Sequence, residues 1–193
     1  MSSRAAFLDR DGVINRKALG NGYVTCWEEI HFLPGIAEAV VLFNQAGFRV
    51  IIVSNQRCIA KGLITMQAMN AIHRQMCDWF AAAGARIDGV YCCPHGTQPP
   101  CNCRKPAPGL LLTAAREHEI DLNASWMIGD SDIDVEAGRN AGCKTARLLQ
   151  RNELATSSPD VTATSLLAAA NLILRREKMA IPMPCDGACN ELG

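Results

Sequence analysis

The chain has 193 residues, of which 49% are hydrophobic and 20% are charged. This length is that of one ordinary domain, and the composition excludes an intrinsically disordered chain. The 19 lysines and arginines balance the 19 aspartates and glutamates, so no net charge attracts nucleic acid or an acidic membrane, and we expect neither as a partner. No apolar run approaches the roughly 20 residues of a membrane helix, and the first residues do not resemble a signal peptide. We therefore expect a cytoplasmic protein.

Short apolar runs alternate with longer segments of helical period, which is typical of an α/β fold. The expected strands are Ala5–Leu8, Phe48–Val53, Gly89–Cys92, Trp126–Ile128 and Thr145–Leu149. The expected helices are Ile36–Gln45, Met66–Ala83, Leu110–His118 and Asp132–Ala141, followed by a helical stretch that ends at 175–178. Strands that are apolar throughout are buried on both faces, and the right-handed crossover rule then predicts a doubly wound parallel sheet.

One domain is expected to occupy residues 1–178. The segments after Asp11 and after Ser54 are too short to hold a large cap domain. Residues 179–193 contain several prolines and glycines and are expected to form a loose C-terminal tail. Cys185 and Cys189 in this tail are interpreted as two exposed thiols rather than metal ligands.

Acidic and hydroxyl side chains follow three of the expected strands. Asp9 and Asp11 come directly after the first strand, Ser54 after the second and Asp130 after the fourth. In such sheets the ligand site lies beyond the carboxyl ends of the strands. Two carboxylates that are partly removed from water repel each other unless a cation lies between them, and Mg²⁺ is the natural oxygen-preferring cation. Gly12 allows the chain to turn sharply away after this pair.

Other polar residues near these strand ends are weaker signals when taken singly. A hydroxyl and backbone N–H groups at Ser54-Asn55-Gln56 suit a phosphoryl group. Lys105, which precedes a proline, is a point charge able to neutralise a carboxylate and phosphate pair. Asp132 and Asp134 are explained as first-turn acids of a helix, although Asp134 is equally well placed to support the water shell of a metal.

The order of these motifs resembles the haloacid dehalogenase superfamily of phosphatases. The superfamily pattern is DxD, then Ser, then Lys, then GDxxxD, and here it extends from residue 7 to residue 134. Four motifs are similar to the subfamily of heptose bisphosphate phosphatases and histidinol-phosphate phosphatases: Phe7–Gly12, Gly22–Val24, Asn55-Gln56 with Ile59–Gly62, and Cys93–His95 with Cys101–Pro106.

The resemblance implies a role for each matched position. It makes Asp9 the nucleophile that forms an aspartyl-phosphate and Asp11 the general acid and base, with Ser54 and Lys105 stabilising the transferred phosphoryl group. It places Mg²⁺ on the Asp9 carboxylate, the Asp11 backbone carbonyl and Asp130. The implied substrate contacts are Asn55, Gln56, Arg57, Arg104 and Ser131.

A second metal site is indicated by a cysteine-rich loop at residues 92–104. Cys93, His95, Cys101 and Cys103 provide three thiolates and one imidazole, a full tetrahedral set that is typical of structural zinc. Cys92 competes with Cys93 as a ligand, and Cys93 is preferred because the Cys-Pro-His order matches the family. Zinc at this place would fix the direction of Arg104 and Lys105. His73 receives no functional role.

The expected substrate is a small phosphorylated metabolite acted on by a monomeric, Mg²⁺-dependent enzyme. The resemblance favours the 7-phosphate of D-glycero-D-manno-heptose 1,7-bisphosphate over histidinol phosphate. A longer, more basic loop at 16–21, Arg57-Cys58, and Ser131 after Asp130 depart from the family pattern near the substrate. A non-catalytic zinc-stabilised binding protein is the remote alternative, and neutral charge and few aromatics argue against a nucleic-acid 3′-phosphatase.

Overall fold

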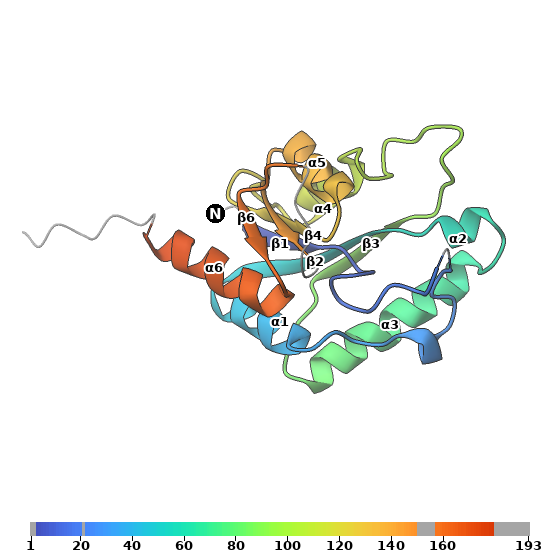
Figure 1. The fold of residues 1–193 in the computed structure, drawn as a ribbon, viewed down its shortest axis with the longest axis horizontal. Helices are drawn as coiled ribbons and strands as arrows, with labels where there is room; N and C mark the ends of the chain where they lie inside the picture. Colours follow the sequence, from blue (N-terminus) through green and yellow to red (C-terminus); the bar gives the residue numbers. More distant parts are fainter. Residues whose placement is uncertain (1–2, 21, 150–156, 180–193) are drawn as a thin grey trace, which may run out of the picture.

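The computed structural model describes residues 3–20, 22–149 and 157–179 (Figure 1). Its six strands form one sheet in the order β3-β2-β1-β4-β5-β6, and every neighbouring pair is parallel. The strands are β1 (Arg4–Leu8), β2 (Phe48–Asn55), β3 (Gly89–Cys93), β4 (Trp126–Gly129), β5 (Lys144–Leu148) and β6 (Val161–Ala163). The predicted doubly wound parallel sheet is confirmed.

Helices cover both faces of this sheet. They are the 3₁₀ helix η1 (Trp27–Glu29), α1 (Ile36–Gln45), α2 (Arg57–Ala60), α3 (Met66–Ala82), α4 (Gly109–Glu117), α5 (Asp132–Ala141) and α6 (Leu166–Met179). Helices α1, α3 and α6 lie on one face, and α4 and α5 lie on the other (Figure 1). The molecule is thus a three-layer sandwich in which the sheet is the middle layer.

The core is divided between the two faces because side chains alternate along each strand. In β1, Ala6 and Leu8 pack under α1 and α6, whereas Ala5 and Phe7 face α4 and α5. All four of these side chains are fully buried. This burial on both faces is the reason that the strand appears in the sequence as an unbroken apolar run.

The end of β4 shows how the sequence begins a helix beside the sheet. Ser131 is the N-cap of α5 and forms a capping box with Asp134, and Gly142 ends the helix in the left-handed conformation at φ 87°. The polar residues after β4 therefore start α5 at the edge where β1 also ends.

The structure differs from the sequence prediction mainly in its short elements. The three-residue strand β6, the four-residue helix α2 and η1 were not expected, because elements of this length leave no periodicity to recognise. The C-terminal helix ends at Met179, and the predicted loose tail, with Cys185 and Cys189, lies outside the described residues.

The described segments contain no large cap domain, as predicted. The chain between β1 and α1 holds only η1, and the chain between β2 and β3 holds α2 and α3. None of the described helices is both long and apolar enough to span a bilayer.

Candidate active site

The candidate site lies where the strand order reverses. Chain-consecutive strands extend outward from β1 in one direction, and the chain then returns to place β4 on the other side of β1. Leu8 of β1 pairs with Ile128 of β4, and the backbone N–H of Asp9 donates to the Ile128 carbonyl at 3.0 Å. Asp9 and Asp130 therefore leave adjacent parallel strands at the same edge, where open α/β sheets bind their ligands.

Lys105 joins the carboxylates that follow these strands. Its Nζ lies 2.7 Å from Asp9 Oδ1 and 2.7 Å from Asp134 Oδ1, and it donates to the Val53 carbonyl at 2.8 Å. The lysine is 3% exposed. Its three ammonium protons thus have three acceptors, which is the condition under which a buried charge is tolerated.

The same arrangement sets the charge state of this cluster. Burial raises the pKa of Asp9 to about 7, an effect that Lys105 opposes and Asp134 reinforces. Burial alone would lower the pKa of Lys105, but Asp9 and Asp134 more than offset this and hold it above its usual value. Lys105 therefore remains protonated, and additional positive charge beside Asp9 would favour the ionised form of this carboxylate.

Asp130 provides an oxygen that has no partner among the described residues. Its Oδ1 is buried and makes no hydrogen bond there, while its Oδ2 lies 2.6 Å from Lys17 Nζ. Gly12 passes directly over this carboxylate with φ 97°, and a Cβ at that position would lie 1.9 Å from Asp130 Oδ2. The expected sharp turn at Gly12 is present, and only glycine fits this close approach.

These carboxylates fit a hard divalent cation. One oxygen from each of Asp9, Asp130 and Asp134 can be chosen such that all lie within 4.8 Å of one another. Burial raises the pKa of Asp130, and Lys17 counteracts this rise. Converging oxygens, one of them without a partner, form the donor set that Mg²⁺ prefers.

The Asp11 carboxylate accepts hydrogen bonds from three side chains. Arg10 donates to both of its carboxylate oxygens, Asn15 Nδ2 donates to Oδ1 at 2.9 Å, and Gln56 Nε2 donates to Oδ2 at 3.1 Å. Burial raises the pKa of Asp11, but Arg10 and these amides outweigh burial and hold it below its usual value. The carboxylate is therefore ionised at neutral pH and fixed in one orientation.

Polar residues at the end of β2 and directly after it contact the catalytic candidates. Gln56 Nε2 also donates to Ser54 Oγ at 2.7 Å. The Asn55 side chain donates to the Lys105 carbonyl and accepts from the Lys105 N–H, both at 3.0 Å. Asn55 thus fastens the loop that carries Lys105 to the end of β2.

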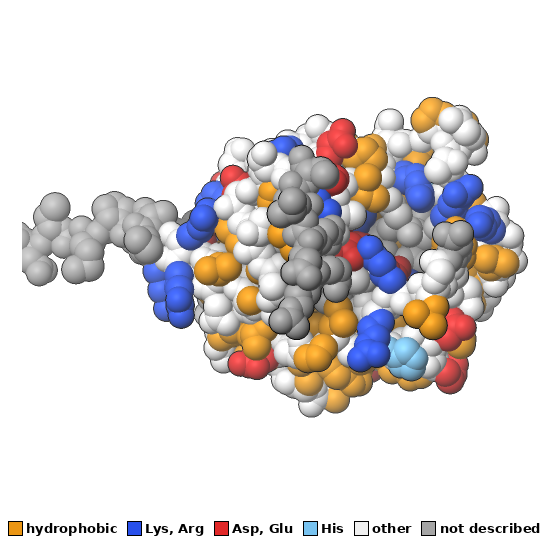
Figure 2. All heavy atoms as spheres, viewed as in Figure 1, with side chains coloured by type: hydrophobic (Ala, Val, Ile, Leu, Met, Phe, Trp, Pro, Cys, Tyr) orange, Lys and Arg blue, Asp and Glu red, His pale blue; other side chains and the backbone are white. Residues whose placement is uncertain are grey.

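The remaining predicted substrate residues lie around this edge. Arg57 begins α2 and makes no side-chain hydrogen bond or ion pair within the described residues, and Arg104 Nη1 donates to the His95 carbonyl at 3.3 Å. The Ser131 hydroxyl is used by the capping box with Asp134. In the space-filling view, separate Lys and Arg side chains stand around a small patch of acidic side chains near the middle of the face (Figure 2).

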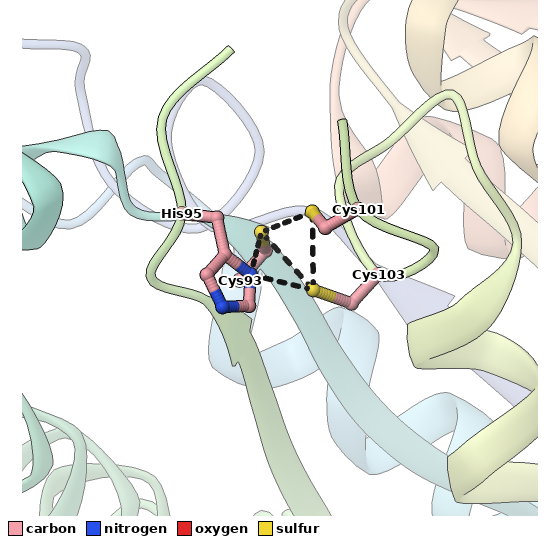
Figure 3. Close-up of side chains that lie close together, drawn as sticks. All are labelled: Cys93, His95, Cys101 and Cys103. Atoms are coloured by element: carbon pink, nitrogen blue, oxygen red, sulfur yellow. Dashed lines mark hydrogen bonds between the residues drawn. The ribbon is translucent and has the colours of Figure 1, made fainter. Parts of the chain in front are cut away.

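The cysteine-rich loop brings its four predicted ligands together. Cys93 ends β3, and the chain returns through an exposed tip at 97–100 to Cys101 and Cys103. The sulfur atoms are 3.2 to 3.6 Å apart, and His95 Nδ1 is 3.6 Å from Cys93 Sγ and 3.2 Å from Cys103 Sγ (Figure 3). Cys92, the competing candidate, is outside this group, with its Sγ 4.0 Å from Met66 Sδ.

The size and chemistry of this group fit zinc. A tetrahedral ion with bonds of about 2.3 Å to sulfur separates its sulfur ligands by about 3.8 Å, close to the spacing present here. Burial acts to raise the pKa of Cys101, but hydrogen bonds from Cys103 and the backbone lower it to about 6. Burial and the hydrogen bonds to Cys93 and Cys101 raise the pKa of Cys103 to about 12. One negative sulfur thus opposes the next ionisation, and a dication would relieve this repulsion.

Two residues at the site, Lys17 and Arg10, and one ion pair were given no role from the sequence. Lys17 and the ion pair between Lys105 and Asp134 depend on contacts between distant segments, which no local pattern reveals. Arg10 lies within the motif Phe7–Gly12, but only its burial in the structure shows that its side chain points into the protein. The position of Arg10 between Asp9 and Asp11 is the sequence feature that could have indicated a role for it at the site.

Known proteins are similar to this chain in fold and in sequence. A family model described as "HAD-hyrolase-like" matches residues 102–169. D-glycero-beta-D-manno-heptose-1,7-bisphosphate 7-phosphatase from Rhodopseudomonas palustris is 44% identical over 145 residues, which are 72% of this chain and 79% of that protein. The chain belongs to the haloacid dehalogenase phosphatases. The resemblance found in the sequence is thereby confirmed.

Two further members of this haloacid dehalogenase group extend the match over nearly the whole chain. The D-glycero-alpha-D-manno-heptose-1,7-bisphosphate 7-phosphatase of Burkholderia mallei is 37% identical and covers 94% of both chains. The crystal structure of D,D-heptose 1,7-bisphosphate phosphatase from B. bronchiseptica, complexed with magnesium and phosphate, superimposes with a TM-score of 0.81 at 32% identity. It covers 90% of this chain and 99% of that one. Because the named relatives include both anomers, their names do not select one.

Proposed function

We propose that this chain removes the 7-phosphate of D-glycero-D-manno-heptose 1,7-bisphosphate through an aspartyl-phosphate on Asp9, in the synthesis of heptose for lipopolysaccharide or related compounds. The observation that carries the proposal is the Asp9 carboxylate at the strand-order reversal, 2.7 Å from the buried Lys105 ammonium, in a chain 44% identical to a phosphatase of that name. The site holds a nucleophile and a neutralising cation in contact before any substrate arrives.

The first chemical step transfers the phosphoryl group to the protein. A carboxylate oxygen of Asp9 forms a bond to phosphorus while the bond from phosphorus to the sugar oxygen breaks. The negative phosphate that binds beside Asp11 favours the protonated form of this carboxyl group, which then gives its proton to the departing oxygen. Lys105 and Ser54 lie beside the oxygens of the moving group, where their charge and hydrogen bond act.

The second step returns Asp9 to its starting state. Asp11, now a carboxylate, takes a proton from a water molecule as the water oxygen bonds to phosphorus. The bond between phosphorus and the Asp9 oxygen breaks, and phosphate leaves. The ionised state that Arg10, Asn15 and Gln56 favour for Asp11 suits this step as a base.

Mg²⁺ is the proposed cofactor of this site. Asp9, Asp130 and the backbone carbonyl of Asp11 are its proposed protein ligands, and Asp134 is placed to support its surroundings. When bound, the ion would neutralise phosphate charge and favour ionised Asp9. Lys17 pairs with the other carboxylate oxygen of Asp130, so its positive charge would oppose the binding of the cation.

Zinc on Cys93, His95, Cys101 and Cys103 is proposed to have a structural role. All four positions of a tetrahedral ion would be filled by protein, which leaves no open position for chemistry. Cys103 directly precedes Arg104 and Lys105, so the zinc would order the segment that carries the essential cation. Unpaired thiols of this kind persist in a reducing compartment, which supports the cytoplasmic location.

The second phosphate of the substrate is proposed to meet Arg57 and Arg104. Arginine binds phosphate through paired N–H donors. Within the described residues the Arg57 guanidinium makes no hydrogen bond or ion pair that would compete with this role. Gln56 and Asn55 are proposed to act near the substrate through Asp11 and Lys105, which they contact directly. A monomer remains our prediction for the assembly.

The test is phosphate release in Mg²⁺ from both anomers of heptose 1,7-bisphosphate and from histidinol phosphate. We expect one phosphate per heptose, with the phosphate at carbon 1 retained in the product. Asp9→Asn should lower turnover by about 10³-fold or more, because an amide cannot replace the nucleophile.

Each alternative outcome identifies which part fails. Preferred hydrolysis of histidinol phosphate would leave the chemistry intact and overturn the substrate. An Asp9→Asn variant with full activity would overturn the proposed mechanism.

A further inference from the structure

Arg10 lies between the two aspartates of the motif, yet its side chain is fully buried. The side chains on either side of it reach the open edge of the sheet, where Asp9 meets Lys105. Burying a guanidinium is costly unless its donors are matched by acceptors. The contacts of Arg10 therefore show what the protein gains by placing a charge there.

One side of the guanidinium grips Asp11. Nε donates to Oδ1 at 3.1 Å, and Nη2 donates to Oδ1 at 3.0 Å and to Oδ2 at 2.8 Å. A guanidinium is a rigid planar fork, so paired contacts of this kind fix the plane of a carboxylate as well as its position. Lysine, with one rotating ammonium, cannot reproduce this restraint.

The other side of the guanidinium is anchored on α3. Nη1 donates to Met69 Sδ at 3.2 Å and lies 3.4 Å from His73 Nε2. Both residues are buried, Met69 completely and His73 to within 6%. Arg10 is thus clamped between a helix of the outer layer and the carboxylate at the sheet edge.

Asp11 has no comparable anchor of its own. Asn15 and Gln56 each donate one hydrogen bond to it, and both come from segments next to the open edge. Asn15 and Gln56 are also buried, but of the three residues Arg10 is the one that reaches both carboxylate oxygens of Asp11 and also contacts α3. A proton donor must be held within a fraction of an ångström of its productive place to act efficiently.

We propose that Arg10 is a positioning residue which, anchored by Met69 and His73 on α3, holds the Asp11 carboxylate where it exchanges a proton with the leaving oxygen of the substrate. This inference rests on the proposed function, because it takes the acid and base role of Asp11 from there. It adds a second layer to the site that joins α3 to the chemistry.

The test compares two phosphate esters that differ in their need for a proton. The sugar phosphate releases an alkoxide, which must be protonated as it departs. The ester p-nitrophenyl phosphate releases a stabilised phenolate, which departs without help. Misplacing Asp11 should therefore lower kcat/KM, which reports the first chemical step, far more for the sugar phosphate than for p-nitrophenyl phosphate, whereas general damage to the fold should lower both alike. The later attack of water, in which Asp11 acts as a base, is common to both esters and does not enter kcat/KM.

For Arg10→Met we expect kcat/KM on the sugar phosphate to fall by about 100-fold, the usual contribution of a positioned acid or base. On p-nitrophenyl phosphate kcat/KM should change by less than about threefold, so the ratio of the two kcat/KM values is the measured quantity. Arg10→Lys keeps the charge without the fork and should restore only part of the loss. Arg49→Met is the matched control, because Arg49 also contacts a carboxylate, that of Asp88, far from the site.

Two milder variants guard against a failure to fold. Met69→Leu conserves side-chain volume, and His73→Gln keeps a polar group, so both should fold while loosening the grip on Arg10. We expect the same selective loss for both, reduced to about three- to tenfold. An equal effect on the two esters in these variants overturns the proposal even if Arg10→Met cannot be purified.

Asp11→Asn separates this proposal from the function on which it rests. If Asp11→Asn shows the selective loss but the Arg10 and α3 variants do not, the positioning role fails and the proposed function stands. If Asp11→Asn lowers kcat/KM equally for both esters, the acid role of Asp11 fails, and the role of Arg10 with it.

Discussion

The two candidate metal sites of this molecule are held in place by different means. The carboxylate site begins at the ends of β1 and β4, where buried backbone already fixes Asp9 and Asp130. Its negative charge is partly neutralised within the protein, since Lys105 pairs with both Asp9 and Asp134. The cysteine site instead lies on a loop whose tip at 97–100 is exposed and whose three sulfur atoms crowd one another.

This difference separates what the fold supplies from what a metal supplies. At the carboxylate edge the sheet sets the geometry, and a cation is needed for charge and chemistry. At the cysteine loop Cys93 is fully buried, whereas Cys101 and Cys103 are only partly buried against the same core cluster, so the metal is needed to fix the geometry. Removing the buried ammonium of Lys105 should therefore disturb the carboxylate site most. Removing zinc should disturb the cysteine site most.

The largest effect is expected from Lys105→Met. Removing this lysine leaves two buried carboxylates facing each other, which should lower the free energy of unfolding by about 3–5 kcal/mol. Activity should fall by about 10²- to 10³-fold, as for loss of one donor to the transferred group. Chemical denaturation and phosphate release measure the two. Lys144→Met is the control, because Lys144 is 42% exposed in its pair with Glu177 and should contribute less than about 1 kcal/mol.

The next largest effect concerns how the free energy of unfolding depends on pH through His73, the buried histidine that contacts Arg10. Burial, and then Arg10, lower the pKa of His73 from 6.5 to about 4. Between these two values the unfolded chain binds a proton at this histidine and the folded chain does not, so stability falls as the pH falls through this window. From pH 7 to pH 4 the wild type should lose about 3 kcal/mol more than His73→Gln.

Denaturation series at both pH values give this difference directly. The exposed residue His31 provides the control, since His31→Gln should follow the wild type. Equal losses in wild type and His73→Gln would show that His73 is not kept neutral in the folded protein.

A smaller effect on global stability is expected when zinc is removed. Cys103→Ser should abolish the binding of about one zinc per chain, because a neutral hydroxyl is a poor zinc ligand. The free energy of unfolding of the sheet should change by less than about 1 kcal/mol, since the loop packs little apolar surface. Elemental analysis and denaturation measure these quantities, and Cys92→Ser should retain its zinc. A fully unfolded Cys103→Ser protein would contradict the comparison.

The smallest effect is expected from Lys17→Met. The ammonium of Lys17 pairs with Asp130 and competes with a cation for that carboxylate, but it is 57% exposed. Such a pair is worth at most about 1 kcal/mol, so Mg²⁺ should bind up to about fivefold more tightly to the variant. Calorimetric titration with Mg²⁺ measures this change. Lys178→Met alters net charge equally from a distant helix and should leave the affinity as it is.

The sequence predicted well those features that one strand end carries by itself. Asp9, Ser54 and Asp130 each follow an apolar run, and a parallel sheet places such ends at one edge. Cys93 and its partners were predicted because ligand type and spacing survive in the sequence without tertiary information. Both patterns are local, and both describe what the structure brings together.

The features that it could not predict depend on contacts between segments distant in the chain. Asn55 was assigned to substrate, yet its amide is occupied by the backbone of Lys105, 50 residues away. Arg10 was overlooked because charged residues beside aspartates are usually solvated, and only the position of α3 turns it inward. The oligomeric state was predicted without a pattern behind it, and it remains a prediction.

The cysteine loop also contains the place where this protein should tolerate inserted residues. Its start is fixed by the Cys93 carbonyl, which accepts from the Gln56 N–H at 2.8 Å, and its return is fixed by the Asn55 clamp on Lys105. The exposed tip at 97–100 adds nothing to either anchor, and doubling the length of a loop costs only about 0.6 kcal/mol. The tip is therefore the natural place for insertions to accumulate between homologues, and a fluorophore or affinity peptide inserted there would report on the active-site edge without disturbing it.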